Sequence, residues 1–249
     1  MALAPLLGGV LNQQFGFRAN FYAIAICVFA SLFCTFFLLD ETLPAGKRTK
    51  FKIEQIIANF FRVLTNPKFL QLTLVISLLF AGFLLFLSNS AIIFVIEFGI
   101  DKSMYPYYQF SLLLAYLTAS LVSGYLIKNY SIKFVKKLGM CCLLLSNFSF
   151  FIVTYTCPEN AILLTLSMVP YSFGFIWLQT PYVAEIMGLM PDIKGIAASI
   201  LTSLRLLITT GVVASGARMY NGTIIPTFIW IFIINFLILL IAYRYERKS

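Results

Sequence analysis

The chain has 249 residues, of which 61% are hydrophobic and only 11% are charged, so it has too little polar surface to cover a soluble globule of this size. Its 18 Lys and Arg outnumber its 9 Asp and Glu but fall in short clusters between apolar runs, which argues against a nucleic-acid-binding face. It has no His, and its Cys residues form no CxxC pair, so we expect no metal site and no disulfide framework in an all-α integral membrane protein.

The N-terminal region contains a partial span and a complete one. Residues 2–11 form an apolar run of about ten residues, which at ~1.5 Å per residue crosses only about half of a ~30 Å hydrocarbon core, so we expect a helix cut short. The sequence NQQFGFR at 12–18 is typical of a turn. Residues 21–39 are almost wholly apolar and predict one membrane helix that ends before Asp40 and Glu41.

Residues 44–68 form the only long polar segment and separate the first helices from the rest. The segment contains a single acid, Glu54. Its basic residues are Lys47, Arg48, Lys50, Lys52, Arg62 and Lys68. Because basic loops tend to stay on the cytoplasmic side, we expect a cytoplasmic loop that joins two unequal sets of helices.

Six further membrane helices are predicted after this loop. They cover residues 69–98, 106–127, 138–156, 161–190, 196–216 and 223–243. Pro170 and Pro181 fall inside the fourth of these spans. A proline within a span predicts a kink whose freed carbonyl a neighbouring group must satisfy.

The distribution of the basic residues predicts the orientation. Successive connections between spans lie on alternating sides of the membrane. The connections on one side contain the six basic residues of the long loop, four at 128–137, Lys194, and three at the C-terminus. The opposite set holds only Arg18, Lys102 and Arg218. By the positive-inside rule we expect the long loop, residues 128–137 and the C-terminus to face the cytoplasm.

The N-terminal residues resemble a known family. The run ALAPLLGG, the turn with GFR and the span ending LLDETLP are similar to the fifth and sixth helices of the major facilitator superfamily, and more narrowly to its Bcr/CflA branch of bacterial drug/proton antiporters. The resemblance implies two six-helix halves joined by a basic cytoplasmic loop. Residues 1–43 would be a remnant of the N-terminal half (the end of helix 5, and helix 6), residues 44–68 the central loop, and residues 69–249 the complete C-terminal half (helices 7–12).

The helix-5 antiporter signature of this family has the form GPxxGG. Here it is APLLGG, in which Pro5, Gly8 and Gly9 match and Ala4 replaces the first Gly. In the family this motif lets helix 5 pack closely on the other half, and paired glycines without side chains make such packing physically sensible. A weaker resemblance covers residues 191–205, which are similar to the junction between helices 10 and 11.

Arg205 is the leading candidate for a transport site, because a charge near the middle of a span costs roughly 2.5–3.5 kcal/mol on insertion scales. At about 100° per residue, Thr202, Arg205 and Thr209 share one helical stripe that faces protein or water. On this stripe Arg205 would contact an anionic group of a substrate, or a carboxylate that moves during transport. The alternative is a structural Arg that bonds helix carbonyls or reaches toward the membrane surface, and the residues alone leave both open.

Other polar and aromatic side chains within spans are further candidates for substrate binding. One arc of span 161–190 carries Tyr171, Phe175, Gln179 and Tyr182. Aromatic walls with a few polar handles suit flat, amphipathic or cationic molecules. Glu185 lies toward the cytoplasmic end as a candidate gate or salt bridge, and Asn89 is a candidate ligand contact in span 69–98. The alternatives are ordinary packing for the arc and a helix–helix hydrogen bond for Asn89.

We expect a secondary active transporter that exports drugs or other small organic molecules in exchange for protons, here as a truncated chain that cannot transport alone, because alternating access needs two halves. Two alternatives stay open: a carrier of a small, anionic metabolite that uses Arg205, and a non-transporting membrane remnant or assembly partner. The expected partners are the lipid bilayer of a bacterial inner membrane, a small-molecule substrate, protons and the missing N-terminal half. The sequence has no phosphate-binding Gly loop and no nucleophile–base pair, so we expect no enzyme activity and no cofactor.

Overall fold

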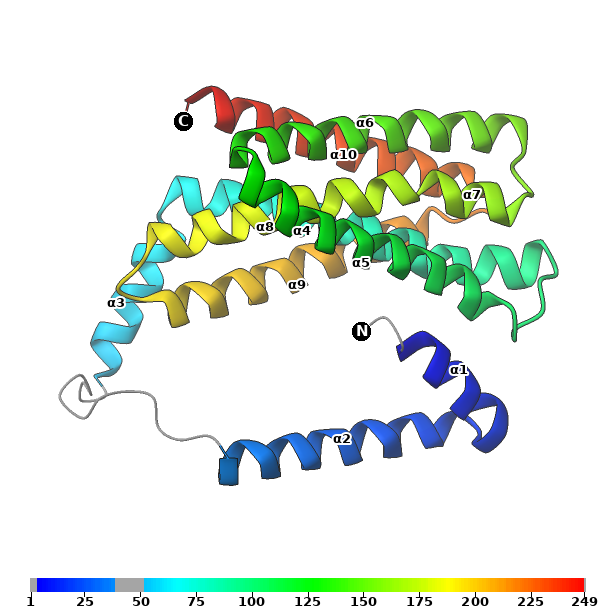
Figure 1. Ribbon diagram of the computed structural model, residues 1–249, viewed down its shortest axis with the longest axis horizontal. Helices are drawn as coiled ribbons and strands as arrows, with labels where there is room; N and C mark the ends of the chain where they lie inside the picture. The colour runs from blue at the N-terminus through cyan, green and yellow to red at the C-terminus, as the bar shows by residue number, and fades with distance from the viewer. Residues whose placement is uncertain (1–3, 39–51, 249) are drawn as a thin grey trace. The chain divides into compact units, whose positions relative to one another are not determined.

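The computed structural model describes residues 4–38 and 52–248, and within these ranges the chain is helical and has no β-strand (Figure 1). The helices belong to two compact units, residues 1–57 and residues 58–249. The boundary between the units falls within a short helix, α3 (Ile53–Leu64).

In the first unit, α1 (Ala4–Phe15) packs against α2 (Phe17–Leu38). The chain turns at Gly16, whose φ of 78° is a left-handed conformation that glycine adopts easily. The predicted turn at 12–18 is therefore wrong for residues 12–15 and 17–18, which are helical, because polar Asn and Gln side chains do not by themselves end a helix. α2 is apolar on all sides, and none of its residues is buried.

The second unit is a bundle of long helices. They are α4 (Pro67–Ile92), which continues as a π-helix, η2 (Ile93–Glu97), then α5 (Tyr105–Asn129), α6 (Ile132–Thr156), α7 (Ala161–Ser167), α8 (Val169–Leu189), α9 (Lys194–Arg218) and α10 (Ile225–Lys248). Together with α2, and counting α4 with η2 and α7 with α8 as single spans, the described residues form 7 helices long and apolar enough to cross a membrane. The predicted all-α membrane fold with its complete spans is confirmed.

α3 lies in segment 44–68, which the sequence predicts as a loop and of which residues 44–51 fall outside the described ranges. Its apolar residues recur every three or four positions, so the helix is strongly amphipathic. The exposed members of its apolar face include Ile53, Ile57, Phe61 and Leu64. The expected loop is thus partly helical, because this spacing favours a helix even where the average hydropathy is low. At the end of the segment, Asn66 caps α4 by accepting a hydrogen bond from the Phe69 N–H at 3.0 Å.

α6 begins well before the predicted start at residue 138. Ser131 is its N-cap, with an extended backbone and a side-chain oxygen that accepts a hydrogen bond from the Phe134 N–H at 3.2 Å. Lys133, Lys136 and Lys137 therefore lie on the first turns of α6 and not in a loop. The prediction is corrected here because hydropathy marks where an apolar run begins, whereas capping marks where the helix begins.

The span at 161–190 is broken once, at Met168, between α7 and α8. Pro170 lies in the first turn of α8, where a missing N–H costs least. The Ser167 carbonyl at this break accepts hydrogen bonds from two hydroxyls of α6, those of Ser146 at 3.2 Å and Ser149 at 3.1 Å. The carbonyls that the two prolines free are those of Leu166 and Trp177, four residues before Pro170 and Pro181, so the prediction that a neighbouring group satisfies them stays a prediction.

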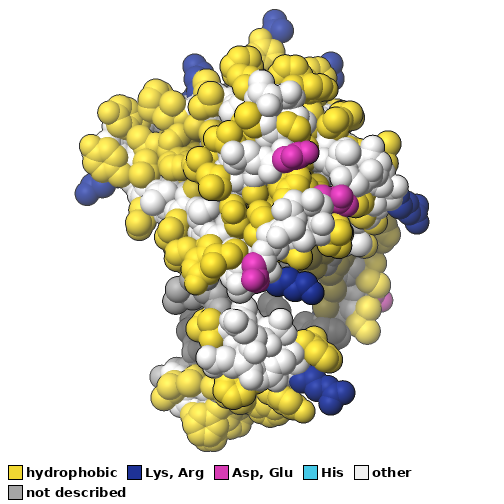
Figure 2. Space-filling view, turned by 90° about the vertical axis from the view of Figure 1, so that its right-hand side faces the viewer, with side chains coloured by type: hydrophobic (Ala, Val, Ile, Leu, Met, Phe, Trp, Pro, Cys, Tyr) yellow, Lys and Arg dark blue, Asp and Glu magenta, His cyan; other side chains and the backbone are white. Residues whose placement is uncertain are grey.

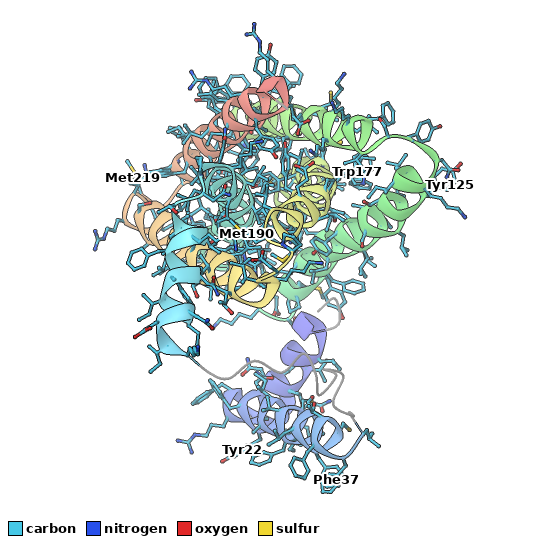
Figure 3. All side chains as sticks on the ribbon, turned by 90° about the vertical axis from the view of Figure 1, so that its left-hand side faces the viewer. Tyr22, Phe37, Tyr125, Trp177, Met190 and Met219 are labelled. Carbon is cyan, nitrogen blue, oxygen red and sulfur yellow. The ribbon has the colours of Figure 1, made fainter. Side chains whose placement is uncertain are left out.

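α4 and α8 occupy the centre of the bundle. α4 contacts α8, α9 and α10, and α8 also contacts α5 and α6. α6 and α8 approach closely at two glycines, since a methyl group added to Gly174 would lie 2.9 Å from the Gly139 carbonyl oxygen. Trp177 of α8, labelled in Figure 3, donates its Nε1–H to the Ala119 carbonyl of α5 at 3.1 Å. These contacts determine which face of each helix carries the candidate site residues.

The two ends of the second unit differ in charge. The C-terminus and the loops after α5 and α8 lie at one end, and the loops after η2, α6 and α9 lie at the other (Figure 1). Figure 2 looks onto the second end and shows Asp and Glu side chains there. Glu97 ends η2, and Asp101 and Glu159 lie in the loops after η2 and α6. Basic residues predominate at the first end, which is the side that the charge rule predicts to be cytoplasmic.

Candidate functional site

Arg205 lies near the middle of α9 and is half-buried. Its guanidinium carbon is 5.1 Å from the centroid of the Phe80 ring on α4, within the range of a cation–π interaction. Among the described residues, no Asp or Glu forms an ion pair with Arg205, and its buried Nε–H has no hydrogen-bond partner. Because a buried donor without a partner is costly, Arg205 has hydrogen-bonding capacity that a ligand could use.

Four aromatic rings lie at this position. Phe175 of α8 is 2% exposed, and its ring centroid is 6.3 Å from that of Phe80 and 5.8 Å from that of Phe83 on α4. The ring of Tyr116 on α5 lies 5.7 Å from Phe175. We call Arg205 and these four rings the Arg205 cluster. It draws residues from α4, α5, α8 and α9, and a cation beside aromatic faces suits an aromatic or anionic organic molecule.

The two threonines that share the predicted stripe with Arg205 have different surroundings. Thr202 is exposed, and its hydroxyl donates to the Ala198 carbonyl of the same helix at 2.9 Å. Thr209 is buried against α4, with its hydroxyl 3.5 Å from the Ser77 carbonyl. Only Thr202 therefore presents its side chain on an open surface of α9.

The predicted arc residues of α8 before and after Phe175 have different surroundings. Tyr171, one turn before it, is fully buried and donates its hydroxyl to the Leu79 carbonyl of α4 at 2.9 Å, which is a packing role. Gln179, one turn after it, is half-buried, and its Oε1 has no hydrogen-bond partner in the described part of the chain. Gln179 thus has a buried acceptor oxygen, one helical turn from Phe175, that no described residue uses.

Tyr182 and Glu185 belong to a second cluster of side chains, nearer the end of the bundle at which the C-terminus lies. Lys136 of α6 has a side chain only 4% exposed and pairs with Glu185 of α8 and with Glu246 of α10, the latter at 2.8 Å. Its ammonium lies 4.7 Å from the centroid of the Tyr182 ring. We call these four residues the Lys136 cluster. Glu185, predicted at a gate or in a salt bridge, joins three helices through Lys136.

Asn89 connects α4 to α10. Its Nδ2 donates to the Thr227 Oγ1 at 2.8 Å, and both residues are buried. A second amide pair, in which Asn235 donates to the Asn147 Oδ1 at 2.6 Å, connects α10 to α6. The amide donor of Asn89 is therefore used in a helix–helix bond, the alternative that the sequence left open.

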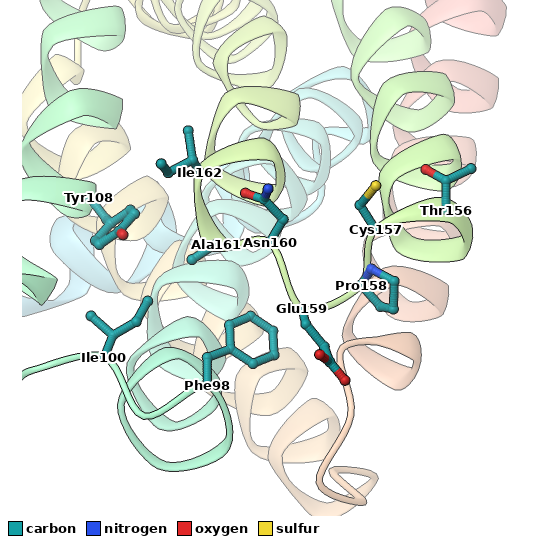
Figure 4. Close-up of a pocket in the computed structure, with 10 residues that line it drawn as sticks. All are labelled: Phe98, Ile100, Tyr108, Thr156, Cys157, Pro158, Glu159, Asn160, Ala161 and Ile162. Atoms are coloured by element: carbon teal, nitrogen blue, oxygen red, sulfur yellow. The ribbon is translucent and has the colours of Figure 1, made fainter.

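A cavity of about 670 Å³ opens at the acidic end of the bundle (Figure 4). Its lining comes from α5, the end of α6, the start of α7 and the loops after η2 and α6, with Glu159 as its acid and Tyr108 and Asn160 among its other polar groups. It contains none of the predicted site residues. Across residues 4–38 and 52–248, no group of three His, Cys, Asp or Glu side chains is placed to hold a metal ion.

Most of the chain matches a known family. Residues 1–213 match the sequence profile of the Major Facilitator Superfamily. The chain belongs to this superfamily. It is also similar to the bicyclomycin resistance protein homolog of Haemophilus influenzae, with 20% identity over 231 residues, which are 90% of this chain and 56% of the relative. The chain thus spans about half the length of the curated relative that it matches, and the predicted resemblance to the superfamily and its Bcr/CflA branch is confirmed.

In this superfamily member, the helix-5 motif lies on α1. A methyl group added to Gly8 would lie 3.7 Å from the Asn20 Oδ1 of α2, which is ordinary van der Waals contact. The side chain of Pro5 lies outside the described part of the chain. Packing of the motif against another half stays a prediction.

Sequence reasoning missed Lys136 and Phe80. Lys136 could have been found by extending α6 back to Ile132, because it then shares the buried face of Gly139 and Leu143 at a spacing of three and four residues. Phe80 offered no such signal, since it is one of 26 Phe in an apolar chain.

Proposed function

We propose that the chain forms part of a secondary active transporter that exports drug-like small organic molecules in exchange for protons. The Arg205 cluster carries this proposal: it combines a cation near the middle of a span with four aromatic rings and an unpartnered Nε–H. Transporter sites lie near the midplane of the membrane, where polar groups are otherwise costly. Superfamily membership and the similarity to a bicyclomycin resistance protein homolog support this assignment.

In this proposal the chain acts with a complementary set of helices, because alternating access rocks two halves about a shared site. Residues 69–249 form one half, residues 44–68 the central cytoplasmic loop, and residues 1–43 helices of the other half, with the C-terminus in the cytoplasm. Because Glu185 and Glu246 are both paired with Lys136, we assign the proton-carrying group to the complementary helices.

The absence of an acidic partner for Arg205 among the described residues also favours a second candidate, the transport of a small anionic metabolite. An uncompensated guanidinium attracts carboxylates and phosphates and repels organic cations. Neutral or anionic aromatic molecules are therefore better candidate substrates than cationic ones.

The experiment measures the accumulation of matched neutral, anionic and cationic aromatic probes in the host cell. Deletion of the gene should raise accumulation of exported probes, and the wild-type gene should restore it. Arg205→Gln should reduce the initial export rate roughly tenfold or more, since a hydrogen bond to a charged group contributes about 1.5–3 kcal/mol.

Arg218→Gln is the matched control, because this arginine lies on the same helix but at its exposed end. A loss confined to anionic probes would favour the metabolite carrier, and a loss that includes neutral probes would favour drug export. If deletion changes the accumulation of no probe, transport is contradicted and a role as an assembly partner is favoured instead.

A further inference from the structure

A separate cavity lies where α6 begins and α10 ends. The two helices pack against each other, and a space of about 370 Å³ opens between them. It is lined by Lys133, Lys136, Lys137, Met140, Tyr243, Glu246 and Arg247. We call it the basic cavity, and it shares Lys136 and Glu246 with the ion pairs described above.

The basic cavity has an excess of positive charge. Its acid, Glu246, already accepts a hydrogen bond from Lys136, which also pairs with Glu185. Three exposed cations remain without an ion-pair partner in the part of the chain that the structure describes: Lys133, Lys137 and Arg247. Lys and Arg bind phosphate oxygens through charge-assisted hydrogen bonds, and Arg can do so with two parallel bonds.

Exposed apolar side chains continue from the basic cavity along both helices. On α6 the apolar strip runs through Leu144 and Phe148, and on α10 it runs through Leu240 and Phe236. Tyr243, which is 62% exposed, lies between this strip and the cations. An aromatic side chain at this position is typical of the interface between headgroups and acyl chains.

We propose that the basic cavity binds the headgroup of an anionic phospholipid, whose acyl chains lie along the apolar strip. The cavity is at the bundle end that the charge rule predicts to be cytoplasmic, and basic pockets between membrane helices on that side suit anionic headgroups. A soluble phosphate would make no use of the apolar strip. Three free cations match a doubly charged headgroup such as diphosphatidylglycerol better than a singly charged one. The inference depends on the membrane location of the bundle and not on the transported substrate.

The test is a titration of the purified full chain in neutral detergent with diphosphatidylglycerol that carries a fluorescent label on one acyl chain. Wild-type protein should bind this lipid more tightly than phosphatidylcholine with the same labelled chain. The triple variant Lys133→Gln/Lys137→Gln/Arg247→Gln should weaken binding by about tenfold or more, because each basic residue near an anionic headgroup contributes to the attraction.

The matched control is Lys68→Gln/Lys128→Gln/Lys194→Gln, which removes the same charge from exposed positions at the same end of the bundle. It should change the affinity by less than about twofold. Equal weakening in both triple variants would overturn the proposal in favour of a general attraction between opposite charges. In the wild type, equal affinity for phosphatidylcholine, or displacement of the labelled lipid by millimolar inorganic phosphate, would overturn it without reference to any variant.

Discussion

Two cationic side chains of the bundle, Lys136 and Arg205, differ in their ion-pair partners. Lys136 and Arg205 each lie over an aromatic ring, but Lys136 has two carboxylate partners, whereas no described carboxylate pairs with Arg205. Desolvation disfavours both charges, and only at Lys136 do ion pairs offset it. The partners of a buried cation, more than its position in a span, therefore distinguish a residue that joins helices from one that is available to a ligand.

The largest expected effect on stability comes from Lys136→Met, which leaves Glu185 and Glu246 without their cation. We expect a loss of about 2–3 kcal/mol, below the ~3–5 kcal/mol typical of a fully buried pair, because these acids are 34% and 21% exposed. Thermal unfolding in detergent measures the effect.

The exposed neighbour Lys137→Met is the control for this variant and should shift stability by less than about 0.5 kcal/mol. Adding Glu185→Gln and Glu246→Gln to Lys136→Met should restore most of the loss, since no charge is then left unpaired. Equal unfolding midpoints for Lys136→Met and Lys137→Met would show that the Lys136 cluster does not hold the helices together.

Arg205→Met should change stability less than Lys136→Met does, and in the opposite direction. It removes a buried N–H that has no partner and keeps a long side chain beside Phe80, so we expect stability to be unchanged or raised by up to about 1 kcal/mol. The same unfolding assay measures it. A loss as large as that of Lys136→Met would mean that Arg205 is structural, and the contrast between the two cations would fail.

The smallest effect is expected at an ion pair outside the bundle core. Arg62 of α3 and Asp192 lie 2.5 Å apart, with side chains 53% and 52% exposed, and the hydrogen bond from Arg62 holds the pKa of the Asp192 carboxyl below its usual value. Because the folded pKa is the lower one, the stabilisation is fully present above the unfolded value of about 3.9 and is lost as the pH falls through the folded pKa.

Arg62→Gln should therefore lower the unfolding midpoint slightly at pH 7 in low salt, as expected for an exposed, screened pair. Its difference from the wild type should vanish once Asp192 is protonated in the folded protein. Unfolding curves over a pH series test this prediction, and a constant difference at every pH would contradict it.

The membrane spans could be predicted because a bilayer requires about 20 apolar residues in each helix, which the sequence displays directly. Helix ends in water could not be predicted in this way. The cap at Ser131 and the spacing of apolar residues in α3 act where the average hydropathy is low, so the early start of α6 and the helix within the predicted loop were both missed.

The candidate site could be predicted only in part. Arg205 is visible in the sequence because a charge within a span is rare. The arc on α8 was treated as one surface, but its residues face different neighbours: Tyr171 contacts α4, Phe175 lies in the Arg205 cluster and Tyr182 lies in the Lys136 cluster. Residue spacing determines the face of a helix, but the neighbour that covers each turn depends on the packing of the whole bundle.

The close approach of α6 and α8 has a mechanical consequence. The Gly139–Gly174 contact leaves no room for the helices to slide past each other, and the hydroxyls of Ser146 and Ser149 fasten the broken end of the span to α6. We therefore expect α6 and α8 to move together. We expect a displacement of Phe175 to pass along α8 toward the end that the charge rule predicts to be cytoplasmic, with Pro181 as the point where the helix can bend.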